Sequence, residues 1–281
     1  MLRRSFLASL PAACLAAPAA SSKVHVGCQT NAWNIDPGNI ESFFNVLSTI
    51  QRIGFEGFET GFRNLQPQFG DPQKARERIK ESGLRFFGIH VFLKSYDPRT
   101  AVGPYDLLTS VADGGKALGA ERLIVSGAST PEPEALTRKA KALNRIGEYS
   151  RARGLALAYH NHGPEFSNNY AQIEGLLRET DPALFHLVVD AGHVLRAGAN
   201  PVDFFNRHSD RIVGFHLRDS KNGKEAPLGE GDYQWKPLAE AIRNKNWRGW
   251  LLSEEERVTG EKPGEAATRP AREAIRRIFG P

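Results

Sequence analysis

The stretch Phe185–Asp219 constrains the fold more than any other part of the chain. Two apolar runs rich in β-branched residues, His186–Val189 and Ile212–Phe215, flank a helix-length segment, Asn200–His208. Short apolar runs bounded by loop residues are typical of strands that are buried on both faces. A strand, a helix and a second strand in this order predict a βαβ unit, whose two strands are parallel neighbours.

Each of these two strands ends in a residue able to bind a metal. Asp190 follows the first strand, with His193 shortly after it, and His216 follows the second, with Arg218 beyond it. The carboxyl ends of parallel strands meet at one edge of a sheet, where α/β proteins bind their ligands. The pair Asp190 and His216 therefore predicts the nucleus of a metal site.

The same alternation of strands and helices runs through the rest of the chain. The further predicted strands are Val24–Gln29, Phe55–Glu59, Leu84–His90, Arg122–Ser126, Leu155–His160 and Gly249–Glu254. Predicted helices outside the βαβ unit are Asn39–Ile53, Pro72–Ser82, Tyr105–Leu118, Pro133–Arg153, Tyr170–Glu179, Trp235–Asn244 and Ala266–Ile278. Eight alternations within 281 residues predict an α/β fold, a single (β/α)8 TIM barrel. The alternative is a doubly wound open sheet, which the lack of a glycine-rich fingerprint after the first strand disfavours.

The N-terminal segment has the pattern of an export signal. Residues 1–20 join Arg3 and Arg4 to an apolar run and a small-residue end, typical of a twin-arginine-type signal peptide cleaved after Ala20. We therefore expect a periplasmic or otherwise exported protein, with the barrel in residues 21–281. A disordered N-terminus is the alternative.

The two cysteines refine this interpretation. A lipoprotein would need Cys14 as its lipidated residue, and Pro11, three positions earlier, fits that role poorly. Removal of the signal leaves Cys28 alone, so the mature chain has no internal disulfide. The net charge of +5 comes without a dense basic tract, which argues against a nucleic-acid partner.

Polar residues collect where the predicted strands end. They are Glu59, His90, His160, His162, Asp190, His193, His216, Arg218 and Glu254. Asp190, His216 and Glu254 offer a mixed carboxylate and imidazole set, and His160 or His162 would complete it. Oxygen and nitrogen ligands without thiolate suit Mn²⁺, Mg²⁺, Co²⁺ or Zn²⁺. Glu165 lies close behind in sequence and could fold back over the site.

Six motifs resemble those of the xylose isomerase-like TIM-barrel superfamily. They are Gly54–Thr60, Tyr159–Phe166, Val188–His193, Phe215–Ser220, Leu228–Trp235 and Gly249–Glu256. This sugar phosphate isomerase/epimerase group also includes inosose dehydratases, ketose 3-epimerases and endonuclease IV. The resemblance implies a divalent metal, Mn²⁺ foremost, at Asp190, His216 and Glu254. It also implies substrate contacts from Glu59, His90, His193 and Arg218.

One position departs from the family pattern. Ketose epimerases of this group usually carry a glutamate at the metal position of the fifth strand, where this chain has His160. An imidazole that binds a metal is not free to accept a proton, so inversion by two bases would need His162 or Glu165 as the second base. Chemistry with one base, either isomerisation or elimination beside a carbonyl, is favoured.

These observations predict a metal-dependent isomerase/epimerase or dehydratase. The expected substrate is a non-phosphorylated keto-sugar or keto-polyol that reacts through an enediolate. Glu254 or Glu165 would move the proton, while Arg218 and His90 would hold hydroxyls or the developing oxyanion. We expect no nucleic-acid partner and, after signal cleavage, no membrane partner, and leave homo-oligomerisation open.

Two other functions compete with this interpretation. A non-catalytic sugar-binding barrel would keep the site without turnover, and activity toward ketoses in the presence of metal separates the two. An endonuclease IV-like hydrolase is disfavoured, because it needs a richer set of histidines and glutamates for three metals.

Overall fold

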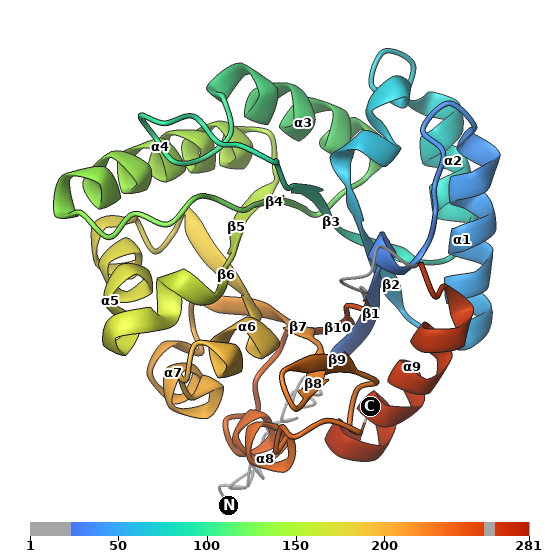
Figure 1. The fold of residues 1–281 in the computed structure, drawn as a ribbon. Helices are drawn as coiled ribbons and strands as arrows, with labels where there is room; N and C mark the ends of the chain where they lie inside the picture. The colour runs from blue at the N-terminus through green and yellow to red at the C-terminus, as the bar shows by residue number, and fades with distance from the viewer. Residues whose placement is uncertain (1–23, 256–261, 281) are drawn as a thin grey trace, which may run out of the picture.

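The computed structural model describes residues 24–255 and 262–280, which form a closed barrel of parallel strands ringed by helices (Figure 1). The barrel strands are β1 (His25–Gln29), β2 (Gly57–Gly61), β3 (Arg85–Val91), β4 (Arg122–Val125), β5 (Ala156–His160), β6 (Phe185–Asp190), β7 (Ile212–Leu217) and β10 (Trp250–Ser253). They pair in sequence order, and β1 closes the barrel against β10. The prediction of a (β/α)8 barrel is confirmed. The predicted signal peptide lies outside the described residues.

The helices form the outer layer, and most follow the predicted ranges closely. They are α1 (Ile40–Ile53), α2 (Gln73–Glu81), α3 (Tyr105–Leu118), α4 (Pro133–Ala152), α5 (Gly163–Glu179), α6 (Ala191–Arg196), α7 (Pro201–His208), α8 (Lys236–Asn244) and α9 (Glu265–Phe279). Local chemistry sets their ends. The side chain of Asn39 caps the start of α1, and Gly54 ends it in the left-handed conformation, with φ 96°. Within the described residues, no helix is both long and apolar enough to cross a membrane.

Three features depart from the predicted elements. A short helix, α6, follows β6 before α7 begins, and α5 starts at Gly163 instead of Tyr170. Residues 167–170 of α5 are non-helical, and Asn168, Asn169 and Tyr170 all have positive φ. A hairpin of β8 (Asp219–Lys221) and β9 (Lys224–Ala226) follows β7. Its turn is Asn222-Gly223, both with positive φ, a two-residue turn that joins antiparallel strands.

The mouth of the barrel is the end at which the carboxyl ends of its strands meet. Below it, a small apolar cluster fills the barrel interior. Phe87, Ile124, Ala158, Val188, Trp250 and Leu252 form this cluster, apart from the larger core between strands and helices. Every second residue of a strand faces the same way. The residues two positions after Ala158, Val188 and Leu252 are therefore directed into the barrel above this cluster.

Candidate metal centre

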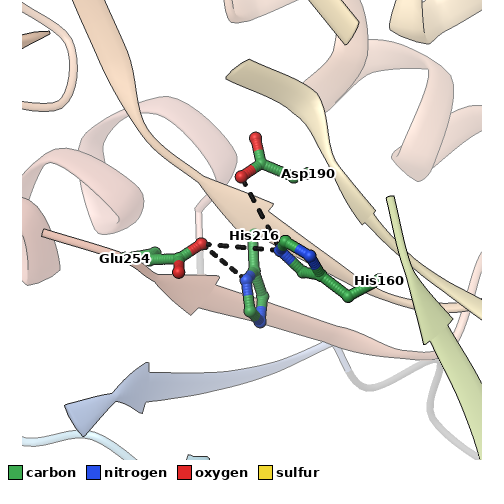
Figure 2. Close-up of side chains that lie close together, drawn as sticks. All are labelled: His160, Asp190, His216 and Glu254. Carbon is green, nitrogen blue, oxygen red and sulfur yellow. Dashed lines mark hydrogen bonds and ion pairs between the residues drawn. The ribbon is translucent and has the colours of Figure 1, made fainter. Parts of the chain in front are cut away.

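Four buried side chains converge above the apolar cluster. His160, Asp190, His216 and Glu254 each offer a ligand atom, and these atoms all lie within 4.8 Å of one another (Figure 2). They come from the ends of β5, β6 and β7 and from the residue that follows β10. The structure thus brings together the four residues that the sequence predicts as metal ligands.

Strand alternation directs these side chains inward. His160, Asp190 and Glu254 stand two positions beyond Ala158, Val188 and Leu252, which belong to the inner cluster. His216 pairs with Leu252 in register, and Asp190 pairs with His216. The same alternation that fills the barrel with apolar side chains therefore places nitrogen and oxygen atoms at its mouth.

The unsatisfied atoms of the group fit a cation. Nε2 of His160 lies 3.7 Å from Oδ2 of Asp190 and 3.7 Å from Oε2 of Glu254. Nε2 of His160 and Oδ2 of Asp190 are buried and make no aligned hydrogen bond, although Oδ2 is in an ion pair with Arg218. Buried polar atoms normally make a hydrogen bond, so atoms left open toward a shared space indicate a ligand. A divalent ion bound by nitrogen and oxygen atoms matches this donor set.

Arg218 adds a positive charge beside the two carboxylates. Its Nε lies 2.8 Å from Oδ2 of Asp190 without hydrogen-bond alignment, and its Nη2 lies 2.5 Å from Oε2 of Glu254. The guanidinium therefore lies at the edge of the metal group, beside both carboxylates. Its predicted role in substrate binding stays a prediction.

Glu59 and His90 brace the group from β2 and β3. Oε2 of Glu59 lies 2.8 Å from Nε2 of His216, and Oε1 lies 3.0 Å from Nδ1 of His90. Nδ1 of His216 lies 2.7 Å from Oε2 of Glu254. The structure thus gives Glu59 and His90 contacts that orient a ligand, and their predicted contact with substrate is untested.

Burial and charge pairing together set the protonation of these groups. Burial alone raises the pKa of Glu59, but His216 and His90 outweigh it and the pKa falls to about 2. Burial alone lowers the pKa of His216, but Glu59 and Glu254 raise it to about 10. Without an ion this imidazole is therefore protonated, and a bound ion would have to displace the proton on Nδ1, which faces Glu254. Burial and the charge of His216 lower the pKa of His160 to about 3. The imidazole of His160 is therefore neutral at pH 7 and has a lone pair for a metal.

Four neutral side chains that the sequence interpretation missed hold the group in place. Asn161 accepts from the amide of Asp190 at 2.9 Å, and Asn31 donates to Oε1 of Glu254 at 3.1 Å. Gln29 and Ser126 complete the set, in contact with Glu59 and with two histidines, respectively. All four lie at or just after the ends of strands, but they carry no charge, so the pattern of titratable residues in the sequence does not reveal them.

His162 and His193 line the more open side of the group. The ring of His162 lies 5.4 Å from that of His160 and 5.1 Å from that of His193, between centroids. Nε2 of His193 lies 3.6 Å from Oδ2 of Asp190. Of the two histidines that the sequence leaves open as the ligand of the fifth strand, His160 is the one that joins the group.

Glu165 lies behind β5 and not with the metal group. It accepts from the hydroxyl of Tyr159 at 2.5 Å and from the amide of His162 at 3.0 Å, and it pairs with Lys139 at 3.4 Å. Tyr159 precedes His160, so alternation turns it away from the barrel interior. The predicted folding of Glu165 over the site is not observed, because its carboxylate is used to cap α5 and to neutralise a buried lysine.

The buried carboxylate of Asp219 organises the loop that contains the motif Leu228–Trp235. Oδ2 of Asp219 accepts from the amides of Gly229 and Gly231 and from the indole of Trp235, at 2.9, 3.3 and 2.9 Å. Both glycines lie close to other atoms, and a side chain at Gly231 would overlap Asp219. The motif is therefore explained by the folding of this loop.

Comparison with known proteins agrees with this architecture. The chain is 24% identical over 270 residues to the inosose dehydratase of Clostridium tetani. The alignment covers 83% of this chain and 90% of that protein. The chain is 32% identical over 138 residues to the inosose dehydratase of Lacticaseibacillus casei, which is 42% of this chain and 46% of that protein. The chain thus aligns with less than half the length of the second relative.

Solved structures show the same fold. A structure of L-ribulose 3-epimerase superposes with a TM-score of 0.78 at 17% identity, and covers 92% of this chain and 95% of that one. At this identity the likeness concerns the fold alone. Residues 47–278 match the family described as xylose isomerase-like TIM barrel. The chain therefore belongs to the xylose isomerase-like TIM barrel family.

Proposed function

We propose that this protein is a divalent-metal-dependent enzyme that removes a proton beside the carbonyl of a keto-sugar or keto-polyol. One observation carries the proposal: four buried ligand atoms from adjacent strands lie within 4.8 Å of one another. His160, Asp190, His216 and Glu254 would hold the ion. When bound, a divalent ion supplies Lewis-acid polarisation of a carbonyl.

The protein's own groups divide the remaining work. Glu254 takes the proton from carbon, and His162, at the open side of the group, is the other group able to move one. Glu165 is left out, because its carboxylate is occupied by Tyr159, Lys139 and the amide of His162. Arg218 and His193 orient hydroxyl groups of the substrate at the mouth.

The proposed reaction is an isomerisation or an elimination. With His160 as the ligand of β5, the ligand set holds two carboxylates, Asp190 and Glu254. Each accepts a hydrogen bond, from the amide of His193 and from Asn31, respectively. We assign the proton transfer to Glu254, as the sequence predicts. A base on one face suffices to form an enediolate and to shift or expel a group, whereas inversion needs a second base. The inosose dehydratases among the relatives support elimination from a keto-polyol.

The experiment follows solvent deuterium into the product. The Mn²⁺-loaded full chain is offered keto-inositols and ketoses in heavy water, and the products are read by NMR. Deuterium at the carbon beside the carbonyl, with dehydrated or isomerised product, is the expected result. Rapid epimerisation would overturn the proposed one-base mechanism, and sugar binding without turnover would point to a binding protein.

Export belongs to the same proposal. Residues 1–20 have the pattern of a twin-arginine-type signal, and sugar phosphates are scarce outside the cytoplasm, so a non-phosphorylated substrate is proposed. N-terminal sequencing of periplasmic protein is expected to begin near Ser21. Recovery of intact Met1 from the cytoplasm alone would contradict export.

A further inference from the structure

Phe92 stands out on the rim of the barrel. It follows β3 directly and is the one large apolar side chain among the described residues that is exposed, at 52%. Its neighbours Val91 and Leu93 are buried, and its carbonyl accepts from Nη1 of Arg63 at 3.0 Å. The backbone beneath the ring is therefore fixed, and the ring is held in solvent by the strand end.

This ring lies on the way to the metal group. The centroid of Phe92 is 5.8 Å from that of His162, whose ring is in turn 5.4 Å from that of His160. The rings of Phe92, His162 and His160 thus form a series that runs from the solvent to a proposed metal ligand. Binding pockets commonly join apolar and aromatic walls to a few polar groups that fix orientation. Phe92, His162 and His160 together have that composition.

The distance between Phe92 and the metal group limits which substrates can contact both. A six-membered sugar ring is about as wide as one ring-to-ring contact, which is 4.5–7 Å between aromatic centroids. A single sugar ring at the metal group can pack against His162, and Phe92 lies one ring contact further out. Phe92 is then left for a second ring attached to that sugar.

We propose that Phe92 and His162 form a second subsite, which binds a ring joined to the sugar at the metal group. The substrate class is then a glycoside, whose attached group is a second sugar or an aromatic ring. Both present a flat face of C–H groups or π electrons, which packs well against Phe92. The inference rests on the proposed function, because that function places the reacting sugar at the metal.

The test measures binding and not turnover. Calorimetry on the Mn²⁺-loaded full chain compares methyl glycosides with phenyl glycosides and with disaccharides, each carrying a ketone on the sugar ring that would lie at the metal. The variants are Phe92→Ala and Phe92→Trp. Tyr149→Ala, in an aromatic residue on α4 of the outer layer, is the matched control, and Mn²⁺ content checks that each variant is folded.

The expected result is a preference of about three- to tenfold for at least one two-ring ligand over its methyl glycoside. Phe92→Ala should lose this preference, while Phe92→Trp and Tyr149→Ala should keep it. Preference for the phenyl glycoside alone assigns an aromatic partner, and preference for the disaccharide assigns a sugar. The subsite is overturned if no two-ring ligand has an advantage, or if Phe92→Ala keeps it. If the ligands bind equally well without Mn²⁺, the proposed function is overturned. The preference for a two-ring ligand can still be measured in that case.

Discussion

The hydroxyl of Ser126 joins two histidines at the mouth of the barrel. Its Oγ lies 3.4 Å from Nδ1 of His160 and 2.9 Å from Nε2 of His90. Because Nδ1 of His160 faces this hydroxyl, Nε2 is turned toward Asp190 and Glu254. Metal-binding histidines usually have their second ring nitrogen held by such a partner, which fixes the orientation of the ring.

We therefore expect Ser126→Ala to weaken Mn²⁺ binding by about 10- to 100-fold, the usual effect of losing such a partner. Ser126→Thr keeps the hydroxyl and should stay close to the wild type. Titration of free Mn²⁺ by electron paramagnetic resonance gives both affinities. Equal affinity in Ser126→Ala and the wild type would mean that the ring of His160 is held by packing alone.

The positions of the ligands follow from the sequence because strand alternation is a local rule. Each predicted ligand stands at the end of an apolar run, and parallel pairing brings those ends together. Asp190 and His216 are thus placed by the pattern of Phe185–Asp219, and His160 and Glu254 by the runs before them.

Other features depend on contacts between distant residues. Glu165 lies near His160 in sequence, but Lys139 on α4 draws its carboxylate behind β5. Ser126 and Asn31 show their roles only when the barrel closes, since their partners are far away in the chain. The β8–β9 hairpin does have a local signal, the Asn222-Gly223 turn, but its strands are too short for a clear alternation.

Removal of the metal should lower the melting temperature. A ligand that binds only the folded state adds about 2.7 kcal/mol when present at a hundred times its Kd. For a chain of this size that corresponds to a shift of about 5–10 °C. Scanning calorimetry with Mn²⁺ and with EDTA measures it. Asp190→Ala should melt at the same temperature under both conditions, and a metal-dependent shift in that variant would show that Asp190 is not a ligand.

Glu165→Leu should destabilise the fold without removing the metal. It would leave Lys139, fully buried, without its carboxylate, and breaking a buried pair in this way costs about 3–5 kcal/mol. Urea unfolding measures the loss. The double variant Lys139→Met with Glu165→Leu should recover much of it, because no buried charge then remains. Loss of metal from both variants at full folding would instead connect Glu165 to the metal group.

The stability of the metal-free protein should fall in mild acid partly through His186. Burial lowers the pKa of this imidazole from its ordinary 6.5, so the unfolded chain binds more protons below that pH. The stability that neutral His186 contributes is present above pH 6.5 and is lost as the pH falls through the folded pKa. Urea unfolding at pH 7 and pH 5 should therefore show a smaller loss in His186→Leu than in the wild type. An equal loss in both proteins would rule out His186 as a cause.

The identity of the residue at position 160 should control the type of reaction. In His160→Glu a carboxylate replaces the imidazole, so metal binding is retained and a second base becomes available on β5. We expect this variant to bind Mn²⁺ in the same ratio as the wild type and to form a larger share of epimerised product from ketoses in heavy water. His160→Ala is the control, and it should lose metal, since Asp190, His216 and Glu254 alone leave the site open. If His160→Ala keeps both metal and turnover, His160 is a spacer, and the one-base mechanism loses its structural basis.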